Sequence, residues 1–95
     1  MLLLPQTVTL REAQDTLRML SQALQREDAS ILTVDASPLR ELDSAAIAVL
    51  LECRRLAQAW GKTFAIHGAP PKLVDLAKLY GVDELLALAP VGQAA

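Results

Sequence analysis

The sequence predicts one α/β domain, in which a mixed, mostly parallel sheet has helices packed on it. The first observation is length, because 95 residues allow a single domain. The second is order, because short β-branched apolar runs alternate with longer runs of helical period, in the order β-α-β-α-β-α. Such alternation favours parallel strand pairs joined by crossover helices. The third is composition: 53% of the residues are hydrophobic but only 3% are aromatic, so the core must be built from small and aliphatic side chains.

The first half of the chain contains two expected strands and one helix. Residues 1–4 form a short apolar run that Pro5 ends, and residues 30–34 predict a central strand. Between them, Thr9 and Glu12 have the spacing of a capping box, which predicts a helix from this point to about residues 25–28. The apolar stripe expected on this helix consists of Leu10, Ala13, Leu17, Leu20 and Leu24. Residues 35–42 are expected to be a loop.

A second long helix is expected from Asp43 or Ser44 to about Trp60, with Gly61 as its C-terminal residue. The remaining expected elements are a strand at 62–67, a turn at 68–71, a helix at 72–80 ended by Gly81, and an ending at 82–88 that fits either a short helix or an edge strand. We expect the domain to occupy residues 1–90, with 91–95 as a flexible tail.

Charge and hydropathy disfavour several classes of function. The net charge is −2 and the sequence has no basic cluster, which disfavours nucleic acid and anionic membrane surfaces as partners. The apolar run 45–51 is too short to span a bilayer, and residues 1–4 are too short for a signal sequence. Cys53 is the single cysteine, so no intrachain disulfide or thiolate cluster can form. We expect a cytoplasmic protein with no direct membrane insertion, no metal and no cofactor.

The first two turns of the second long helix are unusual because residues 45–51 carry no polar side chain. One stripe suits the core and consists of Ala46, Val49, Leu50, Cys53 and Ala57. Ala45, Ala48 and Glu52 lie off that stripe. This helix start is therefore buried on two sides or offers a smooth apolar face to a partner, unless an alanine-rich chain simply leaves small residues exposed.

Three stretches give the chain a resemblance to a known family. The strand 31–35 (Ile-Leu-Thr-Val-Asp), the stretch 39–51 and the strand that follows resemble a STAS domain, the fold of bacterial anti-sigma factor antagonists and of sulfate-transporter tails. Two local features are similar to the MlaB-like group: Leu42-Asp43-Ser44 before small and aliphatic residues, and the segment 76–82. MlaB-like proteins are small subunits of the ABC transporter that moves phospholipids to maintain outer-membrane lipid asymmetry.

The resemblance implies a partner-binding function without catalysis or cofactor. The implied partner is the ATPase subunit of such a transporter, so the chain would be cytoplasmic and peripheral to the inner membrane through that partner. The helix start would supply most of the contacts, joined by the end of the third helix. The expected partner-binding residues are Asp43, Ser44, Ala45, Ala48, Leu51, Glu52, Lys78 and Tyr80. Weak homodimerisation through an uncovered sheet edge stays open.

Three other interpretations remain. Asp43 or Ser44 can be a helix N-cap and nothing more. An anti-sigma factor antagonist typically reads Asp-Ser-Ser/Thr-Gly here and is phosphorylated on the second hydroxyl, but this chain has Ala45 and Ala46 at those positions. A serine hydrolase would need Ser44 and His67, yet Ser44 is not in a Gly-x-Ser-x-Gly elbow.

Overall fold

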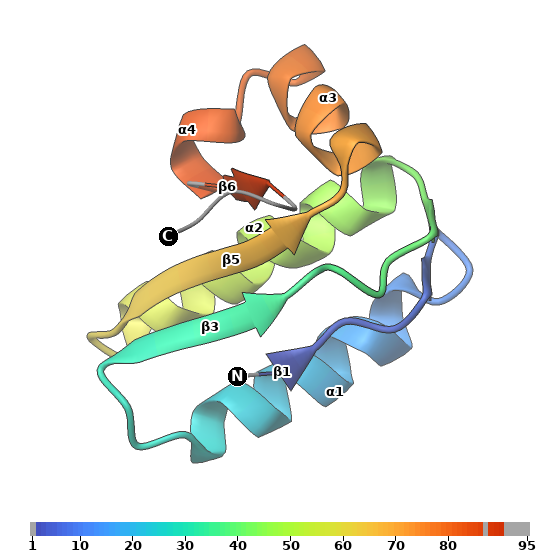
Figure 1. Cartoon of the computed structure of the whole chain (residues 1–95). Coiled ribbons are helices and arrows are strands. Elements are labelled where there is room, and N and C mark those ends of the chain that lie inside the picture. Colours follow the sequence, from blue (N-terminus) through green and yellow to red (C-terminus); the bar gives the residue numbers. More distant parts are fainter. Residues whose placement is uncertain (1, 87, 91–95) are drawn as a thin grey trace.

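The chain folds as a small sheet with a layer of helices on one of its faces (Figure 1). The computed structural model describes residues 2–86 and 88–90. Its elements, in order, are β1 (Leu2–Leu3), β2 (Thr7–Val8), α1 (Ala13–Arg26), β3 (Ile31–Asp35), β4 (Glu41–Leu42), α2 (Ser44–Ala59), β5 (Thr63–Ala69), α3 (Pro71–Leu79), α4 (Asp83–Leu86) and β6 (Leu88–Pro90).

Every strand pairing among the described residues is parallel. The main sheet has four strands in the order β1-β3-β5-β6, and β2 pairs with β4 in a separate two-stranded ladder. The predicted α/β architecture is therefore confirmed. The longest ladder joins β3 to β5 over five residue pairs, from Ile31 opposite Thr63 to Asp35 opposite His67. β1 pairs only with Val34 and Asp35.

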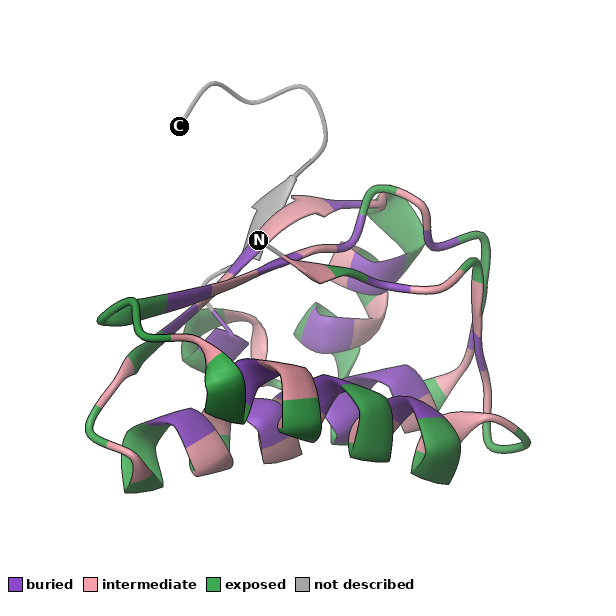
Figure 2. Ribbon diagram, turned by 90° about the horizontal axis from the view of Figure 1, so that it is seen from below, coloured by how far each residue is buried: buried purple, intermediate pink, exposed green. Residues whose placement is uncertain are grey.

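The two faces of the sheet differ in burial. In β3 and β5, Leu32, Val34, Phe64 and Ile66 are buried, while Ile31, which directly precedes Leu32, is 56% exposed. Successive strand side chains point to opposite faces, so the buried set lies on the face that the helices cover. Figure 2 shows this arrangement, with α1 and α2 beneath the sheet.

Helix α2 lies in the middle of the helical layer. It packs against α1 on one side, against β5 above and against α3 and α4 on the other side. Its predicted core stripe is confirmed, because all five members are buried. They are Ala46, Val49, Leu50, Cys53 and Ala57. The helix ends as expected, since Trp60 is its C-cap and Gly61 follows at φ +74°.

The start of α1 differs from the prediction. The helix begins at Ala13 with Glu12 as its N-cap, three residues later than a capping box with Thr9 as N-cap suggested. The Glu12 carboxylate accepts hydrogen bonds from the Thr9 amide (3.2 Å) and the Thr9 hydroxyl (2.6 Å). The Thr9 hydroxyl donates a hydrogen bond to this carboxylate and does not cap the Glu12 amide, which bonds instead to the Thr9 carbonyl (3.0 Å) and closes a turn. Leu10 lies in this turn and is 80% exposed, so its assignment to the core stripe was wrong.

Three further differences concern short elements. The predicted loop 35–42 contains β4, and the predicted turn 68–71 begins with two residues that continue β5. The ambiguous ending contains both a short helix, α4, and a strand, β6. The tail expected at 91–95 lies outside the described residues.

Gly68 makes a bulge in β5 possible. Ile66 pairs with Leu88, and Ala69 pairs with Pro90. Two residues separate the paired positions in β5, but one separates them in β6, so β5 contains a bulge. Gly68 takes φ +66°, and a Cβ at this position would lie 2.9 Å from Oδ1 of Asp35 and 3.0 Å from Cβ of Ser37. That carboxylate oxygen already accepts the Ser37 amide (2.9 Å). The bulge and the turn after β3 are therefore packed against each other.

This contact predicts that Gly68→Ala destabilises the domain more than Gly61→Ala. Both glycines have positive φ, so each substitution costs about 1–2 kcal/mol in backbone strain. Gly61 has open space where a Cβ would be, whereas Gly68→Ala must also displace the Asp35 turn, which adds about 1 kcal/mol or more. Urea unfolding of both variants measures the difference. Equal losses of unfolding free energy would contradict the packing described.

Candidate partner-binding site

The first turns of α2 leave a narrow strip of small side chains uncovered. Ser44 and Ala48 are exposed, and they lie one above the other because residues four apart share a helix face. Ala45 and Leu51 beside them are half-buried. The helix start is therefore not buried on both sides, which leaves the apolar face for a partner and the simple exposure of small residues as the interpretations of this strip. We call Ser44 and Ala48 the α2 ridge.

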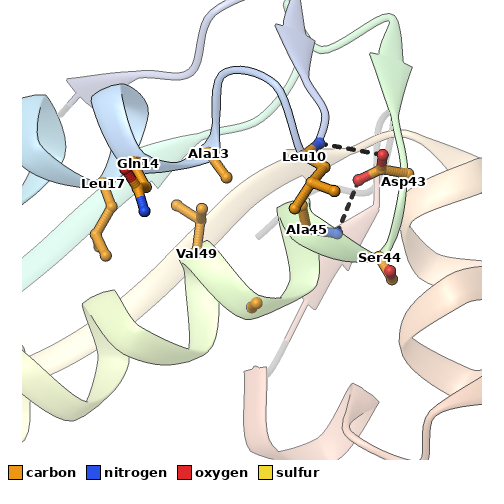
Figure 3. Close-up of a pocket in the computed structure, with 9 residues that line it drawn as sticks. Leu10, Ala13, Gln14, Leu17, Asp43, Ser44, Ala45 and Val49 are labelled. Atoms are coloured by element: carbon orange, nitrogen blue, oxygen red, sulfur yellow. Dashed lines mark hydrogen bonds between the residues drawn. The ribbon is translucent and has the colours of Figure 1, made fainter.

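A groove separates the α2 ridge from α1. It has a volume of about 470 Å³ and is mostly apolar. Figure 3 shows that Leu10, Ala13 and Leu17 line it from the α1 side and that Val49 lines it from α2. Its complete lining is Leu10, Ala13, Gln14, Leu17, Asp43, Ser44, Ala45, Ala48 and Val49. We call it the first groove.

A smaller hollow lies on the opposite side of the α2 ridge. Its volume is about 210 Å³, and its lining joins α2 to the segment between α3 and α4. The lining residues are Ser44, Ile47, Ala48, Leu51, Tyr80 and Val82. We call it the second groove. Ser44 and Ala48 line both grooves, so the two small side chains of the α2 ridge separate the first groove from the second.

Asp43 holds the start of α2 in place. It is the N-cap, and its Oδ1 accepts the Ala45 amide at 2.8 Å. Its Oδ2 accepts the Leu10 amide at 3.1 Å, across 33 residues of sequence. Figure 3 shows both hydrogen bonds, one from each side of the carboxylate. The N-cap interpretation of Asp43 is thus confirmed, and the same carboxylate ties the turn before α1 to α2.

Ser44, unlike Asp43, takes no part through its side chain in the hydrogen bonds that the structure shows at the start of α2. Its side chain is exposed and its hydroxyl makes no hydrogen bond to residues 2–86 or 88–90. In particular, the Asp43 carboxylate binds amides and does not orient this hydroxyl. The hydroxyl is therefore available to a hydrogen-bonding group from outside the chain.

The other expected site residues lie in different places. Tyr80 is 53% exposed and lines the second groove, as does Leu51. Lys78 is exposed on α3 but lines neither groove. Glu52 lies one turn beyond Ala48 and binds the Arg55 side chain, with Nε of Arg55 at 2.9 Å from Oε1. The hydrogen bond from this guanidinium lowers the pKa of the Glu52 carboxyl and keeps it ionised. The ion pair therefore lies one helical turn beyond the α2 ridge.

The sequence did not predict several residues of this site. Leu10 and Leu17 were assigned to the core stripe of the first helix, and Gln14 had no assigned part. Val82 fell in the segment whose structure was ambiguous. The apolar helical period does place Ala13 and Leu17 on the side of α1 that faces α2, but no local pattern reveals that Leu10 is bonded to Asp43.

Apart from Ser44, the groups considered for other chemistry line neither groove. His67 is on β5, in register with Asp35, and no hydrogen bond within the described segments joins it to Ser44. Within these segments, no three His, Cys, Asp or Glu side chains gather as metal ligands do. None of the described helices combines the length and apolar character needed to cross a membrane.

Cys53 is fully buried in the core stripe of α2. Burial, and then the negative charge of Glu52, raise the pKa of its thiol to about 12. Since the thiolate is the reactive form, the thiol is inert in the folded domain, as its place on the inward stripe suggested.

We therefore predict that iodoacetamide at about pH 8.5 alkylates Cys53 only when the domain unfolds, because the unfolded thiol ionises near its ordinary pKa. Mass spectrometry of native and urea-unfolded samples after equal incubation provides the comparison. Equally fast labelling of both samples would show that the α2 core stripe is open.

Comparison with known families agrees with this structure. A family model described as "Mlab, STAS domain" matches residues 4–88. No match is found among curated proteins. STAS domains are generally non-catalytic binding domains that mediate protein–protein interactions. The match covers most of the chain and agrees with the α/β architecture, so the chain belongs to the STAS domain family, in the MlaB-like group that the matching model describes.

Proposed function

We propose that this chain is a non-catalytic subunit that docks on the cytoplasmic ATPase of a phospholipid-transporting ABC system. In this proposal it supports assembly or activity of an ATPase that serves outer-membrane lipid asymmetry, and it lies at the inner membrane through that partner. The observation that carries the proposal is the α2 ridge with its two apolar grooves. The family match supports the coarser assignment to a small regulatory or binding domain.

The shape of this surface suits a protein partner. Ser44 and Ala48 are small, so the backbone of a partner helix can come close to α2 along the ridge. The grooves on either side can each receive an apolar side chain, and the exposed Leu10 and Tyr80 lie at their borders. Central apolar pockets with polar groups at the rim are typical of protein interfaces.

The polar groups of the surface are placed for specificity. The exposed Ser44 hydroxyl lies on the ridge, where it can exchange a hydrogen bond with the partner. The Glu52–Arg55 pair and Lys78 lie outside the grooves, and we assign them to the rim of the contact. Rim charges contribute more to orientation and association rate than to affinity.

The principal test is Ala48→Arg, which places a long charged side chain on the ridge between the grooves. Ala48 is exposed, so the variant is expected to keep its unfolding free energy within about 0.5 kcal/mol. The tagged wild-type chain, recovered gently from its native host, is expected to bring an ABC ATPase and its membrane subunits. Ala48→Arg is expected to lose them. Quantitative mass spectrometry of the recovered proteins gives the measurement.

Ala59→Arg is the matched control. Ala59 is exposed on the same helix, at its C-terminal end, and lines neither groove. The control introduces the same side chain and charge, so it is expected to recover the ATPase as the wild type does. Equal recovery with Ala48→Arg would place the contact elsewhere. If the wild type brings a kinase-like anti-sigma factor, the chain is an anti-sigma factor antagonist and the transporter proposal fails; recovery of nothing specific also rejects it.

A further inference from the structure

We infer that Asp43 is a positioning residue of this docking surface, which acts by holding Leu10 at the border of the first groove and not by contact with the partner. The inference rests on the proposed function, because it concerns the same surface. In this inference Leu10 contacts the partner, and Asp43 affects partner binding only through the position of Leu10.

The Asp43 carboxylate has one hydrogen bond on each oxygen. Oδ1 accepts the Ala45 amide at 2.8 Å, and Oδ2 accepts the Leu10 amide at 3.1 Å. Hydrogen bonds from amides to a carboxylate are about twice as strong as bonds between neutral groups. With one amide of its own chain bound on each oxygen, this carboxylate is a clamp between two segments.

Leu10 is the residue whose position the clamp determines. It lies in the turn 9–12, whose remaining hydrogen bonds among described residues are local: Thr9 bonds to Glu12, and the Glu12 carbonyl accepts the Thr16 amide at the start of α1. The bond to Asp43 fastens the turn directly to the start of α2, beside the β2–β4 ladder in which Val8 pairs with Leu42. The Leu10 side chain extends toward the first turn of α2, near Ala45, and remains 80% exposed (Figure 3).

An exposed leucine with a fixed backbone is a preorganised contact. It forms the open end of a groove whose other walls, Leu17 and Val49 among them, belong to the regular helices α1 and α2. Without the clamp, the turn has to be ordered when the partner binds, and that ordering reduces affinity. The occupant expected at this end of the groove is an apolar side chain of the ATPase subunit, which would cover Leu10.

The test combines Asp43→Asn with Leu10→Ala in a double-mutant cycle of binding to the purified ATPase subunit. Asn caps helices about as well as Asp, so the Ala45 bond is kept, but its amide group offers one acceptor oxygen instead of two. Each single variant is expected to bind about tenfold more weakly, as when one apolar anchor is lost. The double variant is expected to bind no more weakly than Leu10→Ala. If Asp43→Asn weakens binding equally in both backgrounds, Asp43 acts independently of Leu10 and the inference is wrong.

A measurement without the partner separates this inference from the proposed function. Residue-resolved hydrogen exchange should show the Leu10 amide exchanging several-fold faster in Asp43→Asn, while the Ala45 amide stays protected. Asp43→Ser, which can also cap α2 through one oxygen, should give the same result and guards against a folding defect of the first variant. Unchanged Leu10 exchange in both variants would refute the clamp. Faster exchange in a chain whose wild type binds no ATPase subunit would support the clamp and refute the proposed function.

Discussion

The position of α2 in the middle of the helical layer is the constraint on which the surface of this domain depends. One face of the helix is buried against β5, α1 covers one flank, and α3 and α4 cover part of the other. Burial of its core stripe fixes how the helix is rotated about its axis. Only the strip opposite the sheet stays open, and near the N-terminus that strip consists of Ser44 and Ala48. The small side chains leave the two grooves unfilled.

The Asp43 carboxylate links this arrangement to the chain before α1. As an N-cap it satisfies an amide that the first turn of a helix leaves without a partner, and such caps contribute about 1 kcal/mol. Its second oxygen binds the Leu10 amide, which determines where the first groove ends. One side chain therefore contributes both to the stability of α2 and to the shape of the proposed contact surface. An N-cap alone accounts for the bond to the Ala45 amide but not for the bond to the Leu10 amide.

The sequence predicted the elements whose pattern is long and periodic. β3, α2, β5 and α3 were expected within two residues of their observed bounds, because apolar period and glycine stops are local signals. The two-residue strands β2 and β4 are too short to show a period. An exposed small-residue face at the start of α2 was one of the alternatives that residues 45–51 left open, whereas the place of Leu10 had no signal in the sequence, since it depends on a bond to Asp43 33 residues away. The second groove likewise required the fold, because Tyr80 and Val82 meet α2 only through tertiary packing.

Hydrogen exchange of the chain with and without the ATPase subunit shows directly whether the α2 ridge is the docking surface. We expect binding to slow exchange in residues 9–14, 43–52 and 79–82, which carry the α2 ridge and both grooves. Exchange around Ile31 on the uncovered face of the sheet should not change. Protection confined to that face, with α2 exchanging as in the free chain, would contradict the assignment of the α2 ridge as the docking surface.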